Sequence, residues 1–249
     1  MSRPARAGGQ PRSVGGPAPV GFPVLIEKIL PHEVAGAEEF GDPPDAVLYP
    51  GEAELLTRAV DKRRREFRTV RHCARHALRQ LGVSPAPVLR GERGEPHWPA
   101  GIVGSMTHCS GYRAAAVARS SDLHALGIDA EPNEPLPEGV LDVIALGEER
   151  DRLAALNSAD AETHWDRILF CAKESVYKAW FPLTRCWLGF EDAAVTINPG
   201  DAGTAAGTFT VRLLVSAPDP RADRLAHVTG RWVRGNDLVI TAIALPTTP

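Results

Sequence analysis

The chain has 249 residues, of which 43% are hydrophobic and 24% are charged, and its formal net charge is −3. This length and composition suffice for one large globular domain or two small ones. The net charge excludes a globally basic nucleic-acid-binding protein, and no segment is long and apolar enough to span a membrane. The four cysteines show neither a C-x-x-C pair nor metal-ligand spacing, so we expect reduced thiols in a cytoplasmic protein.

The first half of the chain predicts a tail followed by a mixed set of helices and strands. Residues 1–20 are rich in Gly, Pro and Arg without periodicity, which is typical of a flexible tail. Gly82 and Pro85 are expected to end the longest helix, and Ser110–Gly111 to form a turn between two strands. In order, the pattern predicts a strand over 21–31, a loop over 41–52, a helix over roughly 52–81, and strands over 101–110 and 111–120.

The second half predicts a long helix followed by a run of strands. Pro182 should close the long helix, and Gly235–Asp237 should turn a hairpin. The expected order is a strand over 124–130, short helices over 135–144 and 147–156, a long helix over 162–181, and strands over 192–197, 207–216, 227–234 and 237–245. The predicted fold class is therefore α+β, with mostly antiparallel sheets.

Two arginines interrupt the apolar stripe of the helix over 52–81. With Phe67 at the centre of the stripe, Arg63 and Arg71 lie about 40° to either side of it, on the inward face, at 100° per residue. Long arginine stems can simply extend from the edge of a stripe to solvent. Two inward arginines also suit a bound anion, and their forked donors fit phosphate well.

Polar residues end two of the predicted strands. His108 follows Thr107 just before a turn; a lone histidine is more often structural, but a strand end beside a hydroxyl also fits phosphate binding. Asp129 and Glu131 stand one residue apart at the end of an apolar strand. Because alternate residues of a strand leave on the same face, both carboxylates should point the same way.

The helix over 162–181 is apolar almost all round, and yet it carries Glu174 and Lys178. An exposed ion pair at this spacing would stabilise the helix by about 0.3–0.5 kcal/mol. Phe170, Tyr177 and Phe181 flank the pair, however, so a largely buried helix is expected. A glutamate among aromatic rings must be paired, protonated or bound to a metal, which favours a functional site.

The segments "GIDAEP" (127–132) and "FCAKESVYKAWF" (170–181) together resemble the signature of the phosphopantetheinyl transferases, G-[IV]-D-x-E followed by W/F-x-x-K-E-[AS]-x-x-K. Segments 62–78, 91–99 and 104–118 also look like this family, in particular its actinobacterial branch, which primes fatty acyl and polyketide carrier proteins. The resemblance runs from about residue 45 to the end of the chain.

This resemblance implies two similar α/β halves, which we place at residues 21–122 and 123–249, with coenzyme A in the cleft between them. It implies transfer of 4′-phosphopantetheine from coenzyme A to a serine of an apo carrier protein, with release of adenosine 3′,5′-bisphosphate. The partners would be carrier domains of fatty acid, polyketide or nonribosomal peptide synthases, with neither a nucleic acid nor a membrane. The two-half fold suggests a monomer.

The resemblance also implies roles for individual residues. Asp129, Glu131 and Glu174 would bind Mg²⁺, or Mn²⁺, which are hard ions that prefer oxygen ligands. Glu174 would in addition deprotonate the incoming serine, directly or through a water, and Lys178 would neutralise or protonate the leaving group. Asp129, Glu174 and Lys178 are thus the catalytic candidates. The coenzyme A contacts would be Arg63, Arg71, Arg90, Thr107, His108, Lys173 and Lys178.

Two other functions stay open. A Mg²⁺-dependent pyrophosphate hydrolase, acting on coenzyme A or a nucleotide, would use the same carboxylates with water in place of serine. A non-catalytic coenzyme A-binding subunit would need the basic residues but not the acidic ones, and the intact set Asp129, Glu131, Glu174 and Lys178 argues against it.

Overall fold

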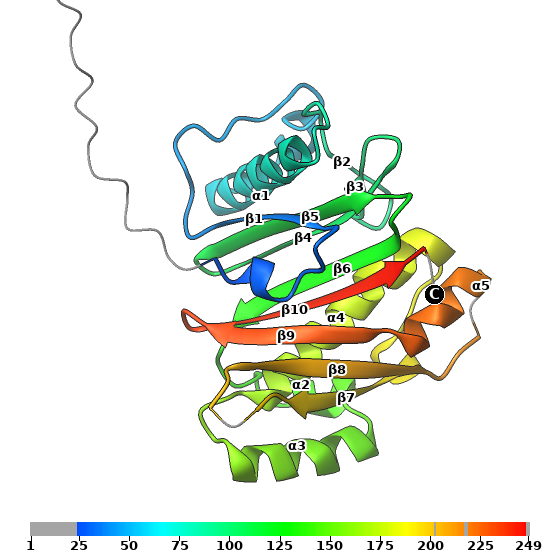
Figure 1. The fold of residues 1–249 in the computed structure, drawn as a ribbon. Helices are drawn as coiled ribbons and strands as arrows, with labels where there is room; N and C mark the ends of the chain where they lie inside the picture. The colour runs from blue at the N-terminus through cyan, green and yellow to red at the C-terminus, as the bar shows by residue number, and fades with distance from the viewer. Residues whose placement is uncertain (1–23, 202, 217–218, 248–249) are drawn as a thin grey trace, which may run out of the picture.

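Two antiparallel sheets lie one after the other along the molecule, and a long helix packs on each (Figure 1). The computed structural model describes residues 24–201, 203–216 and 219–247, so the tail expected over 1–20 lies outside the described residues. No helix within these ranges is long and apolar enough to cross a membrane. The antiparallel sheets with their long helices confirm the predicted α+β class.

The first sheet has three strands and is covered by helix α1 (Asp61–Gln80). Its order is β1 (Ala35–Glu39), β5 (Tyr112–Arg119) and β4 (Ile102–Cys109). Strand β5 is rich in alanine, and two consecutive alanines, Ala114 and Ala115, point to opposite faces and join different core clusters. Small side chains on both faces let α1 approach on one side while the second sheet's core packs on the other.

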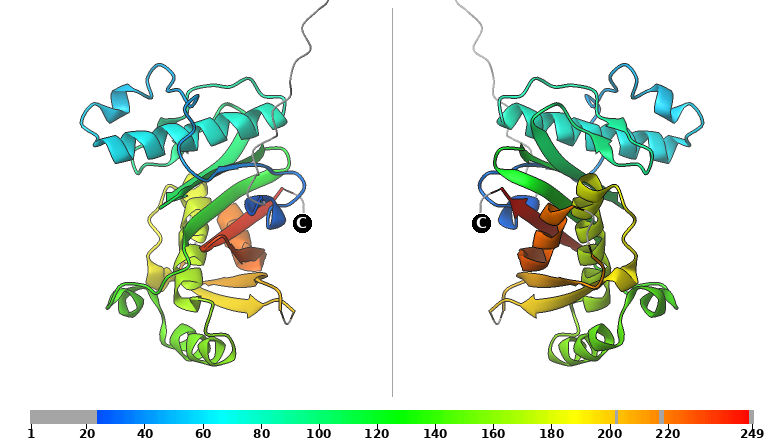
Figure 2. Two further views of the ribbon diagram at one scale, coloured as in Figure 1. Left: turned by 90° about the vertical axis from the view of Figure 1, so that its left-hand side faces the viewer. Right: turned by 90° about the vertical axis from the view of Figure 1, so that its right-hand side faces the viewer.

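The second sheet has five strands and packs against helix α4 (Trp165–Thr184). Its order is β6 (Leu123–Pro132), β10 (Leu238–Pro246), β9 (Thr229–Gly235), β8 (Ala206–Leu213) and β7 (Ala193–Pro199). Figure 2 shows α4 running beside this sheet in the middle of the molecule, with α1 above it at the top of the view. The remaining elements are β2 (Leu89–Arg90), β3 (Pro96–His97), α2 (Val140–Ile144), α3 (Gly147–Ala159), α5 (Pro220–Asp223), and 3₁₀ turns at Ile26–Lys28, Glu54–Leu56, Phe190–Asp192 and Arg224–His227.

Side-chain hydroxyls join the two sheets. Ser105 and Thr107 of β4 accept hydrogen bonds from the backbone N–H groups of Ile128 and Ala130 in β6, each at 3.1 Å. The matched residues ascend together, so the two strands run parallel where they meet. The end of β6 is thereby held against β4, which brings the sites of both halves together.

Several predicted elements differ from the structure in type or in bounds; the short helix expected over 135–144, for example, is limited to Val140–Ile144. The strand expected over 21–31 is a 3₁₀ turn, Ile26–Lys28, in the residues that can be described, and the carboxylate of Glu38 accepts hydrogen bonds from the N–H groups of Leu25 and Ile26. Helix α1 begins at Asp61 rather than near 52, because Val60 is extended. Helix α4 continues through Pro182 to Thr184. The predicted strands around the Ser110–Gly111 turn are confirmed.

Candidate active site

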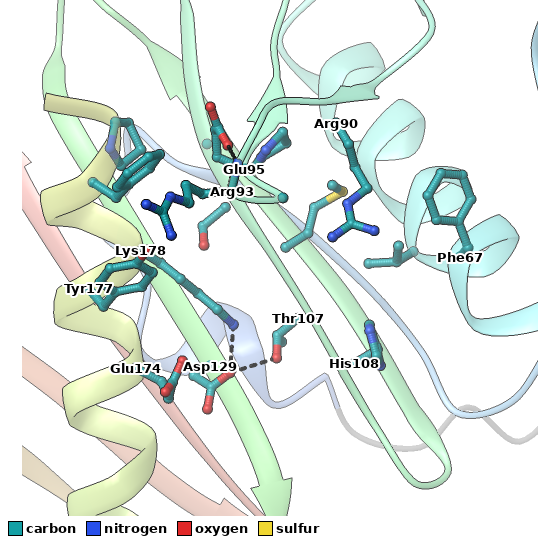
Figure 3. A pocket seen from close by; sticks show the side chains of 18 of the residues that line it. Phe67, Arg90, Arg93, Glu95, Thr107, His108, Asp129, Glu174, Tyr177 and Lys178 are labelled. Carbon is teal, nitrogen blue, oxygen red and sulfur yellow. Dashed lines mark hydrogen bonds and ion pairs between the residues drawn. The ribbon is translucent and has the colours of Figure 1, made fainter. Parts of the chain in front are cut away.

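A cavity of about 280 Å³ lies where α1, β4, β6, α4 and the β2–β3 hairpin meet (Figure 3). One wall is basic and comes from the first half of the chain; the other carries the acidic residues of β6 and α4. Eight of the ten predicted site residues line this cavity: Arg63, Arg71, Arg90, Thr107, His108, Asp129, Glu174 and Lys178.

The basic wall contains a hydrogen-bonded pair, Arg63 and His108. The guanidinium Nη1 of Arg63 donates to Nε2 of His108 at 2.5 Å, while Nδ1 of His108 lies 3.8 Å from the carboxylate of Glu66. Burial, reinforced by the nearby charge of Arg63, lowers the pKa of His108 to about 4. His108 is therefore a neutral imidazole near pH 7 that accepts from Arg63 and orients its guanidinium.

Arg71 is the most deeply buried arginine of this wall. Its side chain is 3% exposed, its Nε donates to the carbonyl of Val88 at 2.9 Å, and its Cζ lies 3.1 Å from the centroid of the Phe67 ring. Burial lowers the pKa of Arg71 to about 9, although the charge of Glu52 opposes the shift. A desolvated guanidinium held by stacking binds an anion strongly, since little water competes for it.

Asp129 is the centre of the acidic wall. Its carboxylate is buried, and Oδ1 accepts hydrogen bonds from Nζ of Lys178 at 2.6 Å and from the Thr107 hydroxyl at 3.0 Å. The other oxygen, Oδ2, is buried and has no hydrogen-bond partner among the described residues. An unsatisfied carboxylate oxygen beside a cavity is a free acceptor for a ligand.

Lys178 and Glu174 face Asp129 from one side of α4. Burial works against the charge of Lys178, but the carboxylate and hydrogen bond of Asp129 outweigh it and raise the pKa of Lys178. Burial, and secondarily the charge of Asp129, raises the pKa of the Glu174 carboxyl. No hydrogen bond to the Glu174 carboxylate is formed by the described residues, so both of its oxygens can take a ligand or a proton.

Gly127 explains how α4 comes so close to β6. A Cβ atom built at this position would lie 1.9 Å from the backbone carbonyl oxygen of Ser175. Any side chain would therefore push the helix away from the strand, and Glu174 sits next to the contact point. The glycine of the "GID" segment thus sets the distance between the two acidic elements.

Glu131 leaves β6 two residues after Asp129, but it does not line the main cavity. It borders an adjacent, more open hollow, and Nη1 of Arg167 lies 3.4 Å from its Oε2. Burial, and secondarily the charge of Asp129, raises its pKa. Within the described ranges, no three His, Cys, Asp or Glu side chains are arranged so that they could hold a metal ion together. The three carboxylates therefore do not form a ready-made triad.

A divalent ion nevertheless fits the donors that Asp129 and Glu174 offer. The buried Oδ2 of Asp129 has no partner, the Glu174 carboxylate accepts no hydrogen bond from the described residues, and the pKa of Glu174 is raised by the nearby charge of Asp129 in addition to burial. A hard cation would satisfy the orphaned oxygen and relieve the repulsion. Glu131 could join only by exchanging its contact with Arg167.

Two predicted coenzyme A contacts are placed differently from the expectation. Lys173 is buried on another side of α4, where its Nζ lies 2.8 Å from Oε2 of Glu149 and donates to the carbonyl of Phe190 at 2.7 Å. It does not line the main cavity but borders a smaller, adjacent one that Glu174 also lines, so its role as a phosphate contact stays a prediction. The Thr107 hydroxyl donates its only proton to Asp129, so Thr107 supports that carboxylate.

The sequence reasoning missed two side chains of the site. Arg93, in the β2–β3 hairpin, lines the cavity near Lys178, and Tyr177 lines it from α4 (Figure 3). The hairpin is tied to the end of α4 by Glu95, whose Oε1 accepts from Nη1 of Arg185 at 2.7 Å. The turn-forming "GERGE" stretch was a usable signal for Arg93, because its arginine stands in a tight turn between two glycines.

The fold and the site define a class of protein, namely an α+β enzyme whose cleft sets arginines against acidic residues and so suits a substrate rich in phosphate. Two family models match the chain: the 4′-phosphopantetheinyl transferase N-terminal domain over residues 51–118, and the 4′-phosphopantetheinyl transferase superfamily over residues 125–241. The two matches together cover the helices and strands that line the cavity.

The chain is also similar to named proteins over most of its length. The chain is 51% identical to 4′-phosphopantetheinyl transferase PptT of Mycobacterium tuberculosis, over 89% of this chain and 98% of that protein. It is 52% identical to 4′-phosphopantetheinyl transferase Svp of Streptomyces mobaraensis, over 89% of each chain. It is 32% identical to enterobactin synthase component D of Salmonella typhimurium, over 81% of this chain and 80% of that protein.

The chain belongs to the 4′-phosphopantetheinyl transferase superfamily. The resemblance expected from "GIDAEP" and "FCAKESVYKAWF" is thereby confirmed, including its actinobacterial character, and so is the activity: this enzyme is a transferase of the 4′-phosphopantetheine group.

Proposed function

We propose that the cavity binds coenzyme A across the boundary between the two halves, and that the acidic wall is where the phosphopantetheine group is transferred. Coenzyme A carries a 3′-phosphate and a diphosphate. The cavity offers Arg63, Arg71 and Arg90 on one side and, on the other, a carboxylate–lysine cluster with Arg93 nearby. The 3′-phosphate fits the arginines, whose charges need no metal, and the diphosphate then extends toward Asp129 and Glu174.

A divalent ion, Mg²⁺ or Mn²⁺, would be held at this point by Asp129 and Glu174, with Glu131 as a third candidate. When bound, such an ion neutralises the diphosphate and holds its oxygens in place. The buried, unpartnered Oδ2 of Asp129 supports this assignment. Attack on a phosphorus needs mainly positioning and charge neutralisation, which these residues are suited to supply.

The side chains of α4 fit the proton transfers of the reaction. The serine hydroxyl of the carrier protein would lose its proton to the Glu174 carboxylate, directly or through a water, at an oxygen that does not hold the ion. The serine oxygen forms a bond to the phosphorus of the phosphopantetheine group, and the bond to the departing adenosine 3′,5′-bisphosphate breaks. Lys178 stabilises the charge on that leaving group and can give it a proton.

A second, smaller cavity fits the pantetheine arm. It has a volume of about 120 Å³ and shares Glu174 and Tyr177 with the main cavity. Trp187, Leu188 and Phe190 give it an apolar lining. The arm is uncharged and flexible, so an apolar cleft beside the reacting phosphate would hold it during transfer.

The partners proposed here are apo carrier domains of fatty acid, polyketide or nonribosomal peptide synthases, met in the cytoplasm by a monomeric enzyme. The cysteines Cys73, Cys109, Cys171 and Cys186 are all free thiols in the structure, which suits a reducing compartment.

One observation carries the proposal: the buried Asp129 carboxylate, fixed by Lys178 and Thr107, lies in the cavity wall with one unpartnered oxygen, and Glu174 lines the same cavity. The test incubates the enzyme with coenzyme A, Mg²⁺ and an apo carrier protein, and the carrier is then weighed by mass spectrometry. A gain of one phosphopantetheine is expected. Consumed coenzyme A with an unmodified carrier would instead indicate a hydrolase, and no change in either would indicate a binding subunit.

A further inference from the structure

A buried carboxylate outside the cavity supports its basic wall. Glu52 is 0% exposed and does not line the cavity. Its Oε1 accepts from the N–H of Val88 at 2.8 Å, its Oε2 accepts from the N–H of Tyr49 at 2.8 Å, and Nη1 of Arg75 lies 3.0 Å from both oxygens. The loop before α1, the helix itself and the segment before β2 all meet at this carboxylate.

Glu52 is linked to Arg71 in two ways. The two charges are 4.0 Å apart, from Oε1 to Nε. Both side chains also bind the backbone of Val88: Glu52 accepts from its N–H, and Arg71 donates to its carbonyl at 2.9 Å. Arg90 follows Val88 by two residues and lines the cavity. Glu52 is thus one contact away from two of the arginines assigned to the 3′-phosphate.

The charge balance around Arg71 makes this contact important. Arg63, Arg75 and Arg90 all lie close enough to disfavour its charge, and Glu52 is the largest influence that favours it. A buried guanidinium surrounded by three others is repelled by them, and a fixed counter-charge is needed to hold it in place. Arg75 satisfies the carboxylate directly, and its guanidinium stacks over the Tyr49 ring at 4.3 Å, so the anchor itself is rigid.

We propose that Glu52 is a positioning residue for the 3′-phosphate subsite: it holds Arg71 and the segment leading to Arg90 in the orientation that binds this phosphate. The inference rests on the proposed function, since it assumes that the arginines bind the 3′-phosphate. It assigns a binding role to a residue that touches neither coenzyme A nor the reacting groups.

The test measures binding of two probes to the full-length enzyme by calorimetry: adenosine 3′,5′-bisphosphate, and adenosine 5′-monophosphate, which lacks the 3′-phosphate. Glu52→Gln keeps the shape and removes the charge. We expect it to weaken binding of the bisphosphate about ten-fold, as for the loss of one charged hydrogen bond, and to leave binding of the monophosphate nearly unchanged. Glu52→Asp, which keeps the charge, should restore part of the loss.

Glu149→Gln is the matched control, because Glu149 is equally buried and is paired with Lys173 in the other half of the chain. It should not change the preference for the bisphosphate over the monophosphate. If Glu52→Gln fails to fold, the double variant Glu52→Gln with Arg75→Gln, which removes both members of the buried pair, should show the same selective loss.

The outcomes separate the inference from the proposal beneath it. If the unmodified enzyme binds both probes equally, the 3′-phosphate assignment is wrong, and the role of Glu52 falls with it. If the unmodified enzyme prefers the bisphosphate and a folded Glu52→Gln enzyme keeps that preference, only the inference is overturned. If Glu52→Gln weakens the binding of both probes equally, Glu52 has only a structural role, and the inference is also overturned.

Discussion

The two halves of the enzyme contribute opposite chemistry to one cavity. The first half supplies Arg63, Arg71 and Arg90, which are suited to bind but not to react. The second half supplies Asp129 and Glu174, whose free oxygens can take a cation or a proton. Under the proposed function, this difference is a division of labour: recognition of the nucleotide end would depend on the first half and the transfer step on the second.

Each half fixes its wall with a buried ion pair. Glu52 and Arg75 lie behind the arginines. Glu149 of α3 pairs with Lys173 of α4, and Lys173 stands next to Glu174 in sequence. A buried pair contributes little net stability, but breaking it by removing one partner costs about 3–5 kcal/mol. Both pairs therefore hold their elements in one arrangement, whatever their net effect on the free energy of unfolding.

The largest expected effect lies in the acidic half. Asp129→Asn or Glu174→Gln should lower kcat by about 10³-fold or more, as for the loss of a base or a charge-stabilising group, in an enzyme that still folds, although Asp129→Asn also breaks the pair with Lys178 and so should lower the melting temperature. Steady-state transfer to a carrier protein measures it. Glu148→Gln is the control, because that glutamate is exposed and paired with Arg212 at the surface. Near-normal turnover in either variant would break the division of labour.

A smaller, selective effect is expected in the basic half. Arg71→Ala or Arg63→Ala should raise KM for coenzyme A by about ten-fold or more, since each removes a charged hydrogen bond to phosphate. KM for dephospho-coenzyme A, which lacks the 3′-phosphate, should hardly change. Arg79→Ala, at the exposed end of α1, is the matched control. A similar rise for both substrates would show that these arginines do not read the 3′-phosphate.

Glu131 should matter less than its neighbour Asp129. It lies outside the main cavity and is already in contact with Arg167. Glu131→Gln is expected to raise the Mg²⁺ concentration needed for half-maximal rate by about 10–100-fold, the range seen for residues that support metal ligands, with kcat largely recovered at high Mg²⁺. A loss as severe as that of Asp129→Asn, and not restored by Mg²⁺, would make Glu131 an equal ligand.

The smallest effect concerns pH. His108 has a pKa of about 4 in the folded protein against an ordinary value of 6.5, so the unfolded chain binds more protons between these values and stability falls as the pH drops through this window. His108→Gln, which keeps an acceptor for Arg63, should lose less stability over the same window. Thermal melts at pH 7 and pH 4.5 test this; identical losses in both proteins would refute it.

Local chemistry made much of the fold predictable. The hairpin at Gly235–Asp237 follows from residues that tolerate a left-handed backbone, and Asn236 and Asp237 have φ values of 51° and 57°. The placement of Asp129 with Glu174 and Lys178 followed from the family resemblance and from two patterns: strand alternation and the apolar surface of α4. Strand alternation and the apolar surface of a helix each depend on residues near in sequence, which is why both patterns could be read from it.

Features that depend on distant residues could not be read from the sequence. The apolar segment after residue 23 suits a strand as well as a turn, and Glu38, which captures its N–H groups, decides the outcome. Lys173 stands one residue before Glu174, but Glu149 draws its ammonium to another side of the helix. Glu52 reads as an ordinary residue near a helix start, because its partners Arg75 and Val88 lie 23 and 36 residues away.

The absence of a side chain at Gly127 sets the distance between β6 and α4. Since the main chain of β6 nearly touches that of α4 there, the spacing between Asp129 and Glu174 is set by backbone thickness and not by adjustable rotamers. A methyl group at this position, as in Gly127→Ala, would push the helix and the strand apart, and the gap between the two carboxylates that the proposed cation would bridge would widen with both acids still present. The separation of the two carboxylates thus depends on a residue that has no functional group at all.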